Sequence, residues 1–303
     1  MEQFLCKVIN KSSGSGFFCR ILKEILNRRF YLCYYIELMM KNIAVLLGGL
    51  AILYGCATVA VTGRQQLNLV PNSELIPMAT QEYKDVIAKG PLSSDAAQTA
   101  QIKKVGGRIE RAVEQYMASI GRTVDLEGFQ WEFNLIDDPK TANAWCMPGG
   151  KVAFYTGILP ICKDETGIAI VMGHEVAHAI ANHGRERMSQ QMLAQLGLSS
   201  LSAVMGQNPT VGKDLLLQAV GAGSQIGMLS FSRQDESEAD HIGLIFLAMA
   251  GYDPNQAPIF WQRMSTLDGG QQPPEFLSTH PSHETRIKDL KGWIPEAMKY
   301  YKK

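Results

Sequence analysis

The spacing of hydrophobic and polar positions changes along the chain and separates helices from strands. Residues 76–90 and 95–118 repeat their hydrophobic positions with the period of a helix, and a break at Gly90-Pro91 lies between them. From 129 to 135 hydrophobic and polar residues alternate, which predicts a half-buried strand. Residues 151–156 follow a turn rich in glycine and are predicted as a second strand.

From residue 165 onward the pattern is mainly helical. We expect helices at 165–184, 187–205, 211–229, 233–250, 254–267 and 281–291. Proline and glycine residues mark the ends of these segments, and the chain has no internal repeat or low-complexity tract. The pattern predicts a predominantly helical α+β fold with one small β-sheet.

The helix expected at 165–184 carries two histidines and a glutamate in the order H-E-x-x-H. His174 and His178 are four residues apart, so both imidazoles project from one face of the helix. Two ring nitrogens at this spacing can bind one zinc ion at about 2.0–2.1 Å. Glu175 lies beside the metal, where it can take a proton from a water molecule. The neighbouring residues are apolar, and burying this cluster without a metal would be costly.

A third metal ligand must come from elsewhere in the chain. One class of zinc peptidases has a histidine six residues after the second one, but that position is Gly184 here. His183 is expected on the wrong side of the helix end for ligation. A glutamate from a later helix is therefore the better candidate.

The segment 232–240 supplies such a glutamate. Ser232 can cap the start of a helix, with Asp235 completing a capping-box-like arrangement. Glu236 and Asp240 then lie one turn apart on one face, whereas Glu238 is expected to point elsewhere, as part of a solvated acidic helix start. We predict that Glu236 binds zinc and that Asp240 fixes the tautomer of a ligand histidine.

Three motifs together resemble the HtpX-like and CAAX-prenyl-protease family of zinc metalloendopeptidases, family M48. They read G-H-E-V-A-H, S-R-Q-D-E-S-E-A-D and N-A-W-C-M-P-G-G-K-V-A-F-Y-T-G-I-L, and the similarity covers residues 75–290. The resemblance is strongest to exported bacterial lipoproteins of the family and to the mitochondrial Oma-type peptidase. It implies a zincin-like metallopeptidase domain whose small sheet packs against the H-E-x-x-H helix.

The resemblance also implies roles for single residues. His174, His178 and Glu236 match the family's zinc ligands, Glu175 matches its catalytic base, and Asp240 matches the acid beside a ligand histidine. The implied cofactor is one zinc ion per chain.

The stretch 143–152 matches the segment beside the family's active site. Its edge strand would hold the substrate backbone by strand addition. We therefore expect Asn143, Ala144, Trp145 and Cys146 to contact the substrate.

A last matching element is the stretch 278–281 together with Arg286. His280 could stabilise the developing oxyanion, occupy the fourth position on zinc in a resting state, or merely cap the following helix; the sequence leaves these alternatives open. Arg286 would anchor this loop or neutralise negative charge near the site.

The amino-terminal part has the pattern of a secretory signal. Residues 40–56 combine a short positive start, a hydrophobic stretch and Gly55-Cys56. The end resembles a bacterial lipobox, in which Cys56 is acylated and becomes the first mature residue, although Tyr54 departs from the usual pattern. A membrane anchor over 43–61 is the alternative.

The lipoprotein interpretation divides the chain into four parts. Residues 1–39 would be an upstream extension that is absent from the mature protein, and 40–56 the signal peptide. Residues 57–75 would form a tether, and 76–303 the metallopeptidase domain. The expected location is the cell envelope, with a lipid anchor in the outer membrane and the domain facing the periplasm.

Composition excludes two other classes of protein. Hydrophobic residues make up 46% and charged residues 19% of the 303 residues, which fits a globular protein with a core and argues against disorder. The formal net charge is zero, so the chain has no general positive field that would attract nucleic acid. Cys146 and Cys162 could form a disulfide or remain buried thiols.

The expected function is zinc-dependent hydrolysis of peptide bonds in proteins of the cell envelope. The resemblance implies quality control of misfolded membrane-associated proteins. The expected partners are protein or peptide substrates and, through the lipid anchor, a membrane. The alternative is a chaperone-like envelope factor that binds client proteins and hydrolyses little.

Overall fold

The computed structural model describes residues 56–196, 231–268, 275–280 and 285–302, together with a few single positions upstream of residue 43. The described residues from 56 onward form one compact unit. The hydrophobic stretch of the predicted signal and the helix predicted at 211–229 lie outside the described residues. Within the described part of the chain, no helix has both the length and the hydrophobicity needed to cross a bilayer.

A three-stranded sheet lies at the centre of this unit. Strand β5 (Lys151–Tyr155) lies between β3 (Glu132–Ile136) and β4 (Ala144–Met147). β3 runs parallel to β5, and β4 runs antiparallel to it. Both strands predicted from the hydrophobic pattern are present, and β4 forms one edge of the sheet.

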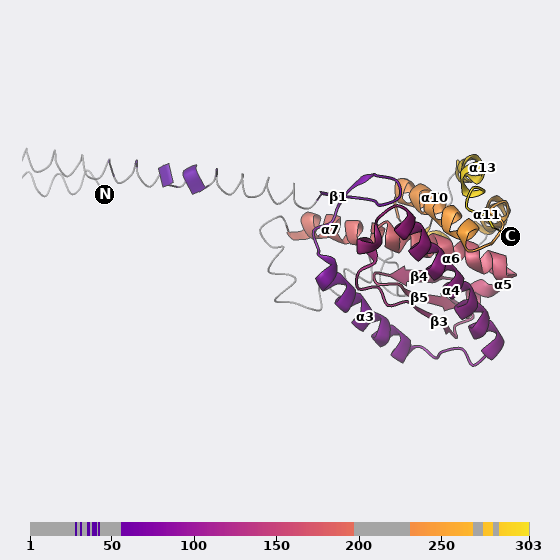
Figure 1. Ribbon diagram of the computed structural model, residues 1–303. Coiled ribbons are helices and arrows are strands. Elements are labelled where there is room, and N and C mark those ends of the chain that lie inside the picture. Colours follow the sequence, from indigo (N-terminus) through magenta and orange to yellow (C-terminus); the bar gives the residue numbers. More distant parts are fainter. Residues whose placement is uncertain are drawn as a thin grey trace, which may run out of the picture. The chain divides into compact units, whose positions relative to one another are not determined.

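Helices cover both faces of this sheet (Figure 1). Trp145 and Ala153 point to one face and pack against α3 (Asn72–Lys89). The side chains that alternate with them, such as Val152 and Phe154, join the core formed with α4 (Ala96–Ser119) and α6 (Glu165–Ile180). The expected helix-rich α+β fold, with a small sheet against the H-E-x-x-H helix α6, is confirmed.

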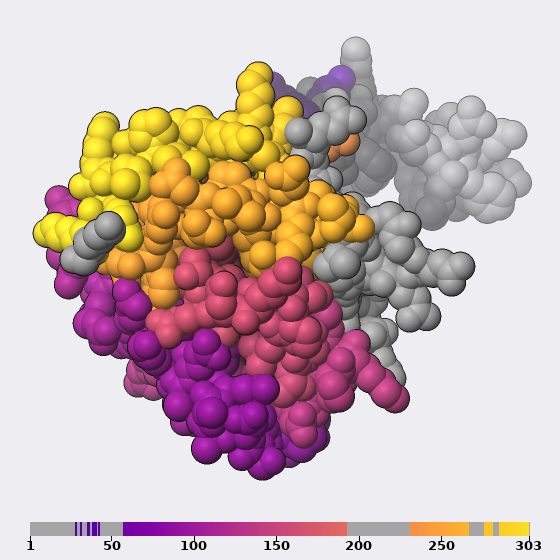
Figure 2. All heavy atoms as spheres, turned by 90° about the vertical axis from the view of Figure 1, so that its right-hand side faces the viewer, coloured from indigo at the N-terminus to yellow at the C-terminus, as the bar shows by residue number. Residues whose placement is uncertain are grey.

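Two carboxyl-terminal helices pack against α6, and a third packs on those two. They are α10 (Arg233–Met249), α11 (Gln256–Asp268) and α13 (Arg286–Ala297), and Figure 1 shows them gathered on the side of the unit opposite α3. In the space-filling view they form one continuous orange and yellow surface (Figure 2). The other described elements are β1 (Cys56–Thr58), β2 (Gln65–Leu67), the 3₁₀ helices η1 (Thr123–Leu126) and η2 (Thr156–Ile158), α5 (Leu159–Cys162), α7 (His183–Leu196) and α12 (Glu275–Thr279).

Helices α6 and α10 approach each other closely at a pair of glycines. A Cβ atom on Gly173 would lie 3.1 Å from the carbonyl oxygen of Gly243, and one on Gly243 would lie 3.0 Å from the backbone of Gly173. Gly173 directly precedes His174, and Gly243 is close to Asp240 on α10. The glycine contact therefore brings together the two helices that carry the predicted metal ligands.

We expect Gly243→Ala to lower the free energy of unfolding by about 1–3 kcal/mol, because backbone atoms of α6 cannot move aside as a flexible side chain could. Urea unfolding with an unchanged m-value would measure this loss. Gly292→Ala in α13 is the matched control, since no described atom outside the neighbouring turns of its own helix lies within 4 Å of the added Cβ atom. The control should be as stable as the unaltered chain or gain about 0.5–1 kcal/mol. Equal stability of the two variants would contradict the close packing.

Residues 57–75, expected as a tether, belong to the folded unit. β1 and β2 pair as an antiparallel hairpin, and α3 already begins at Asn72. Val59 and Val70 are each only 1% exposed. The hairpin strands are three residues long and carry few hydrophobic side chains, so their pattern resembles that of a loop.

The single helix predicted at 165–184 consists of two helices. α6 ends at Ile180, and α7 begins at His183. Asn182 between them has a φ angle of 57°, in the left-handed region that asparagine adopts more readily than most residues. The chain turns at this point, so His183 does not continue the spiral of α6.

Candidate metal centre

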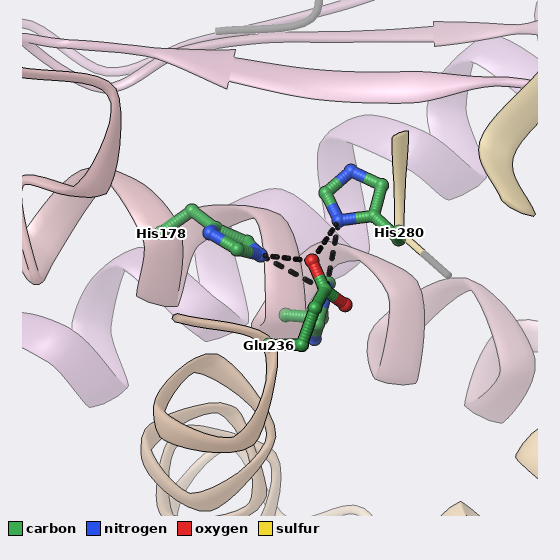
Figure 3. Close-up of side chains that lie close together, drawn as sticks. His178, Glu236 and His280 are labelled. Carbon is green, nitrogen blue, oxygen red and sulfur yellow. Dashed lines mark hydrogen bonds and ion pairs between the residues drawn. The ribbon is translucent and has the colours of Figure 1, made fainter. Parts of the chain in front are cut away.

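Four buried side chains direct donor atoms to one point. His174 and His178 come from α6, Glu236 from the first turns of α10, and His280 directly follows α12. One donor atom of each lies within 4.8 Å of the other three, and no side chain is more than 4% exposed. Figure 3 shows the Glu236 carboxylate between the rings of His178 and His280.

The distances between these donor atoms suit a tetrahedral zinc site. His174 Nε2 lies 3.1 Å from His178 Nε2 and 3.2 Å from His280 Nδ1. The Glu236 oxygens lie 3.4 Å from Nε2 of His174 and of His178, and 2.8 Å from His280 Nδ1. A tetrahedron with ligands about 2.0–2.1 Å from its centre has edges of roughly 3.3–3.4 Å. The nitrogen and carboxylate donors therefore fit zinc in both type and spacing.

A capping box fixes the start of α10 and so the place of Glu236. The Ser232 hydroxyl accepts a hydrogen bond from the Asp235 amide at 3.1 Å, and the Asp235 carboxylate accepts one from the Ser232 amide at 3.2 Å. The cap predicted from the sequence is present. Because Glu236 is the next residue, its backbone is already helical, and it shares a buried face with Asp240.

Asp240 and Arg286 lie behind Glu236 and His174. His174 Nδ1 is 2.9 Å from Asp240 Oδ1, so the carboxylate can accept its N–H and leave the Nε2 lone pair directed at the other donors. Arg286 donates to Asp240 Oδ1 at 2.6 Å and to Glu236 Oε2 at 3.3 Å. Its guanidinium carbon lies 3.2 Å from the centre of the Trp261 ring. The arginine thus balances two buried carboxylates.

Glu175 is buried beside the donor cluster, and one of its oxygens forms no hydrogen bond with the described residues. Among the described residues no group forms a hydrogen bond with Glu175 Oε1, although His280 Nε2 lies 3.4 Å away. Burial raises the pKa of Glu175, and the positive fields of His280 and His174 offset this only in part. A carboxylate with a raised pKa and a free oxygen has the properties of a general base near neutral pH.

The neighbouring Glu236 behaves in the opposite way. Burial alone would raise its pKa as well, but His280 and His174 outweigh this effect and hold the pKa well below its usual range. Glu236 therefore stays charged and able to bind a cation, whereas Glu175 is the carboxylate suited to exchanging a proton.

Of the four residues expected to contact substrate, Cys146 lines the pocket that reaches Glu175 and His178. Trp145 points to the opposite face of the sheet, where its ring packs edge-on against Tyr83. The Asn143 side chain accepts a hydrogen bond from the Ala144 amide. All four are at most 5% exposed, so substrate could reach this segment mainly through the backbone at the edge of β4. Cys146 and Cys162 are free, buried thiols and form no disulfide.

A second set of buried polar contacts lies on the other side of His178. His183, expected to be unconnected with the metal, is 1% exposed, and its Nδ1 lies 2.9 Å from His178 Nδ1. Its Nε2 lies 3.0 Å from Glu238 Oε2. Glu238 is not part of a solvated helix start, because it is only 7% exposed. The signal in the sequence is Asn182, a residue that favours a turn and thereby brings His183 back towards His178.

Glu238 is charged in this setting. Burial alone would raise its pKa, but hydrogen bonds from His183, Thr62 and Arg64 lower the pKa to about 2. A charged carboxylate can only accept hydrogen bonds, which determines the direction of its contact with His183.

Comparison with known proteins gives a consistent picture. The model of Peptidase family M48 matches residues 103–294. The mitochondrial metalloendopeptidase OMA1 of Schizosaccharomyces pombe is 34% identical over 79% of this chain and 67% of its own length. The OMA1 of Saccharomyces cerevisiae is 37% identical over 58% of this chain and 50% of its own. The beta-barrel assembly-enhancing protease of Escherichia coli is 34% identical over 54% of this chain and 34% of its own. The chain therefore spans half or less of the length of the last two relatives.

Proposed function

The chain belongs to peptidase family M48, whose members are metallopeptidases, and on this premise we propose that it is a zinc-dependent metalloendopeptidase of the cell envelope. One observation carries the proposal. Three buried donors of the types that catalytic zinc sites use, His174, His178 and Glu236, surround one point. The Glu175 oxygen that forms no hydrogen bond with the described residues lies beside them.

The chemistry we propose divides the work between the ion and the protein. His174, His178 and Glu236 would hold a zinc ion, which would supply positive charge to polarise a water molecule and a peptide carbonyl. Glu175 takes a proton from the water on its free oxygen and passes it to the nitrogen of the leaving amine. Arg286 and Asp240 keep Glu236 and His174 in place during this transfer, because they contact both ligands from behind.

For His280 we favour the role of a fourth donor in a resting form. Its Nδ1 lies 2.8 Å from Glu236 and 3.2 Å from His174, distances that a helix-capping role alone would not require. Its Nε2 faces Glu175 at 3.4 Å. Binding of substrate would then have to displace this ring, which afterwards remains close enough to donate a hydrogen bond to the developing oxyanion.

The substrates we propose are proteins of the cell envelope, in particular misfolded membrane-associated ones. Relatives are named for mitochondrial metalloendopeptidase activity and for enhancing β-barrel assembly, which supports a role in quality control at membranes. The lipobox-like end at Cys56 supports a lipid anchor. The edge strand β4 offers backbone groups to which an extended peptide could add.

Removal and return of metal tests the proposal. We expect one zinc ion per chain in the purified protein, measured by atomic absorption. Hydrolysis of casein should cease after treatment with a chelator and return with zinc, but not with magnesium, because imidazole nitrogens suit zinc and magnesium prefers oxygen ligands. Hydrolysis that persists in the metal-free protein would contradict the proposal.

A further inference from the structure

A chain of hydrogen bonds connects His178 to the N-terminal hairpin, which we define as residues 56–67. His178 Nδ1 contacts His183 Nδ1, and His183 Nε2 contacts Glu238 Oε2. Glu238 also accepts hydrogen bonds from two hairpin residues, Thr62 through Oγ1 and Arg64 through Nε, the latter at 2.6 Å. His178, His183 and Glu238 are each at most 7% exposed.

The chemistry of these groups allows one direction for the hydrogen bonds when His178 binds a metal. A carboxylate only accepts, so His183 carries its proton on Nε2. Neutral His183 then has a lone pair on Nδ1, which accepts the Nδ1–H of His178. This leaves a lone pair on Nε2 of His178, the atom that faces Glu236. In the opposite direction His178 Nε2 would carry the proton, and a protonated nitrogen cannot bind a metal.

The surroundings prevent these rings from exchanging partners. The rings of His178 and His183 lie 4.9 Å apart with their planes at 74°. Phe231 stacks on His178 at 4.1 Å and is itself 4% exposed. Arg64 is held from a second side by Glu186, to which it donates at 2.8 Å. Glu238 therefore has fixed partners on both sides.

We propose that His183 and Glu238 are positioning residues that hold His178 in its metal-binding tautomer, and that Thr62 and Arg64 of the N-terminal hairpin hold Glu238 in place. Glu238 does for His178, through an intervening imidazole, what Asp240 does directly for His174. The inference rests on the proposed zinc site. It gives none of the four residues a contact with substrate.

The zinc affinity of the full chain tests this role, measured by competition with a chromogenic chelator. His183→Leu removes the acceptor, and we expect zinc affinity to fall by about 10–100-fold. His183→Gln should lose less, because its amide oxygen can accept from His178 while its amide nitrogen donates to Glu238. Glu238→Gln, which changes hardly any volume, allows His183 to turn round and should also weaken zinc binding. The visible spectrum of the cobalt-substituted protein should likewise change more in His183→Leu than in His183→Gln.

His241→Gln is the matched control. His241 also lies on α10 and pairs with a glutamate, Glu296 at 2.8 Å, but it is not one of the four donors. Its loss should leave zinc affinity and the cobalt spectrum unchanged. Urea unfolding of the zinc-free variants separates a loss of folding from a loss of metal binding. If His183→Leu fails to fold, the zinc affinity of Glu238→Gln alone tests the proposal.

Three results would overturn the inference in whole or in part. Zinc binding by His183→Leu as tight as in the unaltered chain would show that His183 does not support the metal site. Zinc binding by His183→Gln as weak as that by His183→Leu would exclude the tautomer argument. Unchanged affinity in Arg64→Gln would remove the hairpin from the proposal. An unaltered chain that binds no zinc would instead refute the proposed function itself.

Discussion

Glu175→Gln is expected to lower kcat for casein hydrolysis by about 10²–10⁴-fold, the usual contribution of a general base. Glutamine has nearly the same shape but cannot take up a proton. Because Glu175 is not itself one of the donors around the proposed ion, the variant should still contain one zinc per chain. Steady-state kinetics and zinc analysis on the same preparation measure both quantities.

Glu165→Gln provides the comparison, since Glu165 begins the same helix and binds Lys104 and Tyr252 at a distance from the donor cluster. It should retain hydrolysis. The Glu175 oxygen that would face water forms no hydrogen bond with the described residues, so Glu175→Gln should unfold at a similar urea concentration to the unaltered chain. Undiminished casein hydrolysis by Glu175→Gln would exclude the peptidase mechanism proposed here.

Arg286→Ala should have the largest effect on stability. Arg286 is 1% exposed and is the cation that contacts both Glu236 and Asp240, so its removal leaves two buried carboxylates without this partner. Breaking a buried ion pair by removing one partner costs about 3–5 kcal/mol. Loss of stacking on Trp261 adds to this cost. Urea unfolding of the zinc-loaded protein would measure the change in the free energy of unfolding.

A surface arginine shows how much of this loss depends on burial. Arg122 pairs with Asp125 at 2.7 Å, but the two side chains are 37% and 28% exposed. Arg122→Ala should therefore cost about 0–1 kcal/mol. If Arg286→Ala and Arg122→Ala lowered the free energy of unfolding equally, the contacts of Arg286 with Glu236 and Asp240 would not contribute as a buried network.

The sequence was sufficient for the parts of the site that depend on spacing within one helix. His174 and His178 share a face because the helical period requires it, and the cap at Ser232 predicts where α10 begins. Once the first residue of α10 is known, Glu236 and Asp240 are expected on one face of that helix, because they are four residues apart. These inferences need no knowledge of how distant segments pack.

The contacts that the sequence did not reveal depend on the path of the chain between elements. Extending the helix beyond His178 predicts that His183 lies on the wrong side, but the left-handed Asn182 ends that helix and returns the ring to the site. Glu238 looked solvent-exposed because its partners, Thr62 and Arg64, come from a hairpin far away in sequence. Pairing between β3 and β5, which is parallel, likewise depends on the connection between them and not on the pattern of either strand.

The N-terminal hairpin also bears on the boundary chosen for a truncated domain. The family match starts at residue 103, within α4, and a recombinant version trimmed to that boundary would keep every metal donor. It would lose Thr62 and Arg64, and with α3 also the Tyr83 hydroxyl that donates to the Val152 carbonyl in the central strand. The range matched by the family is thus smaller than the described unit, and truncation should be planned from residue 56.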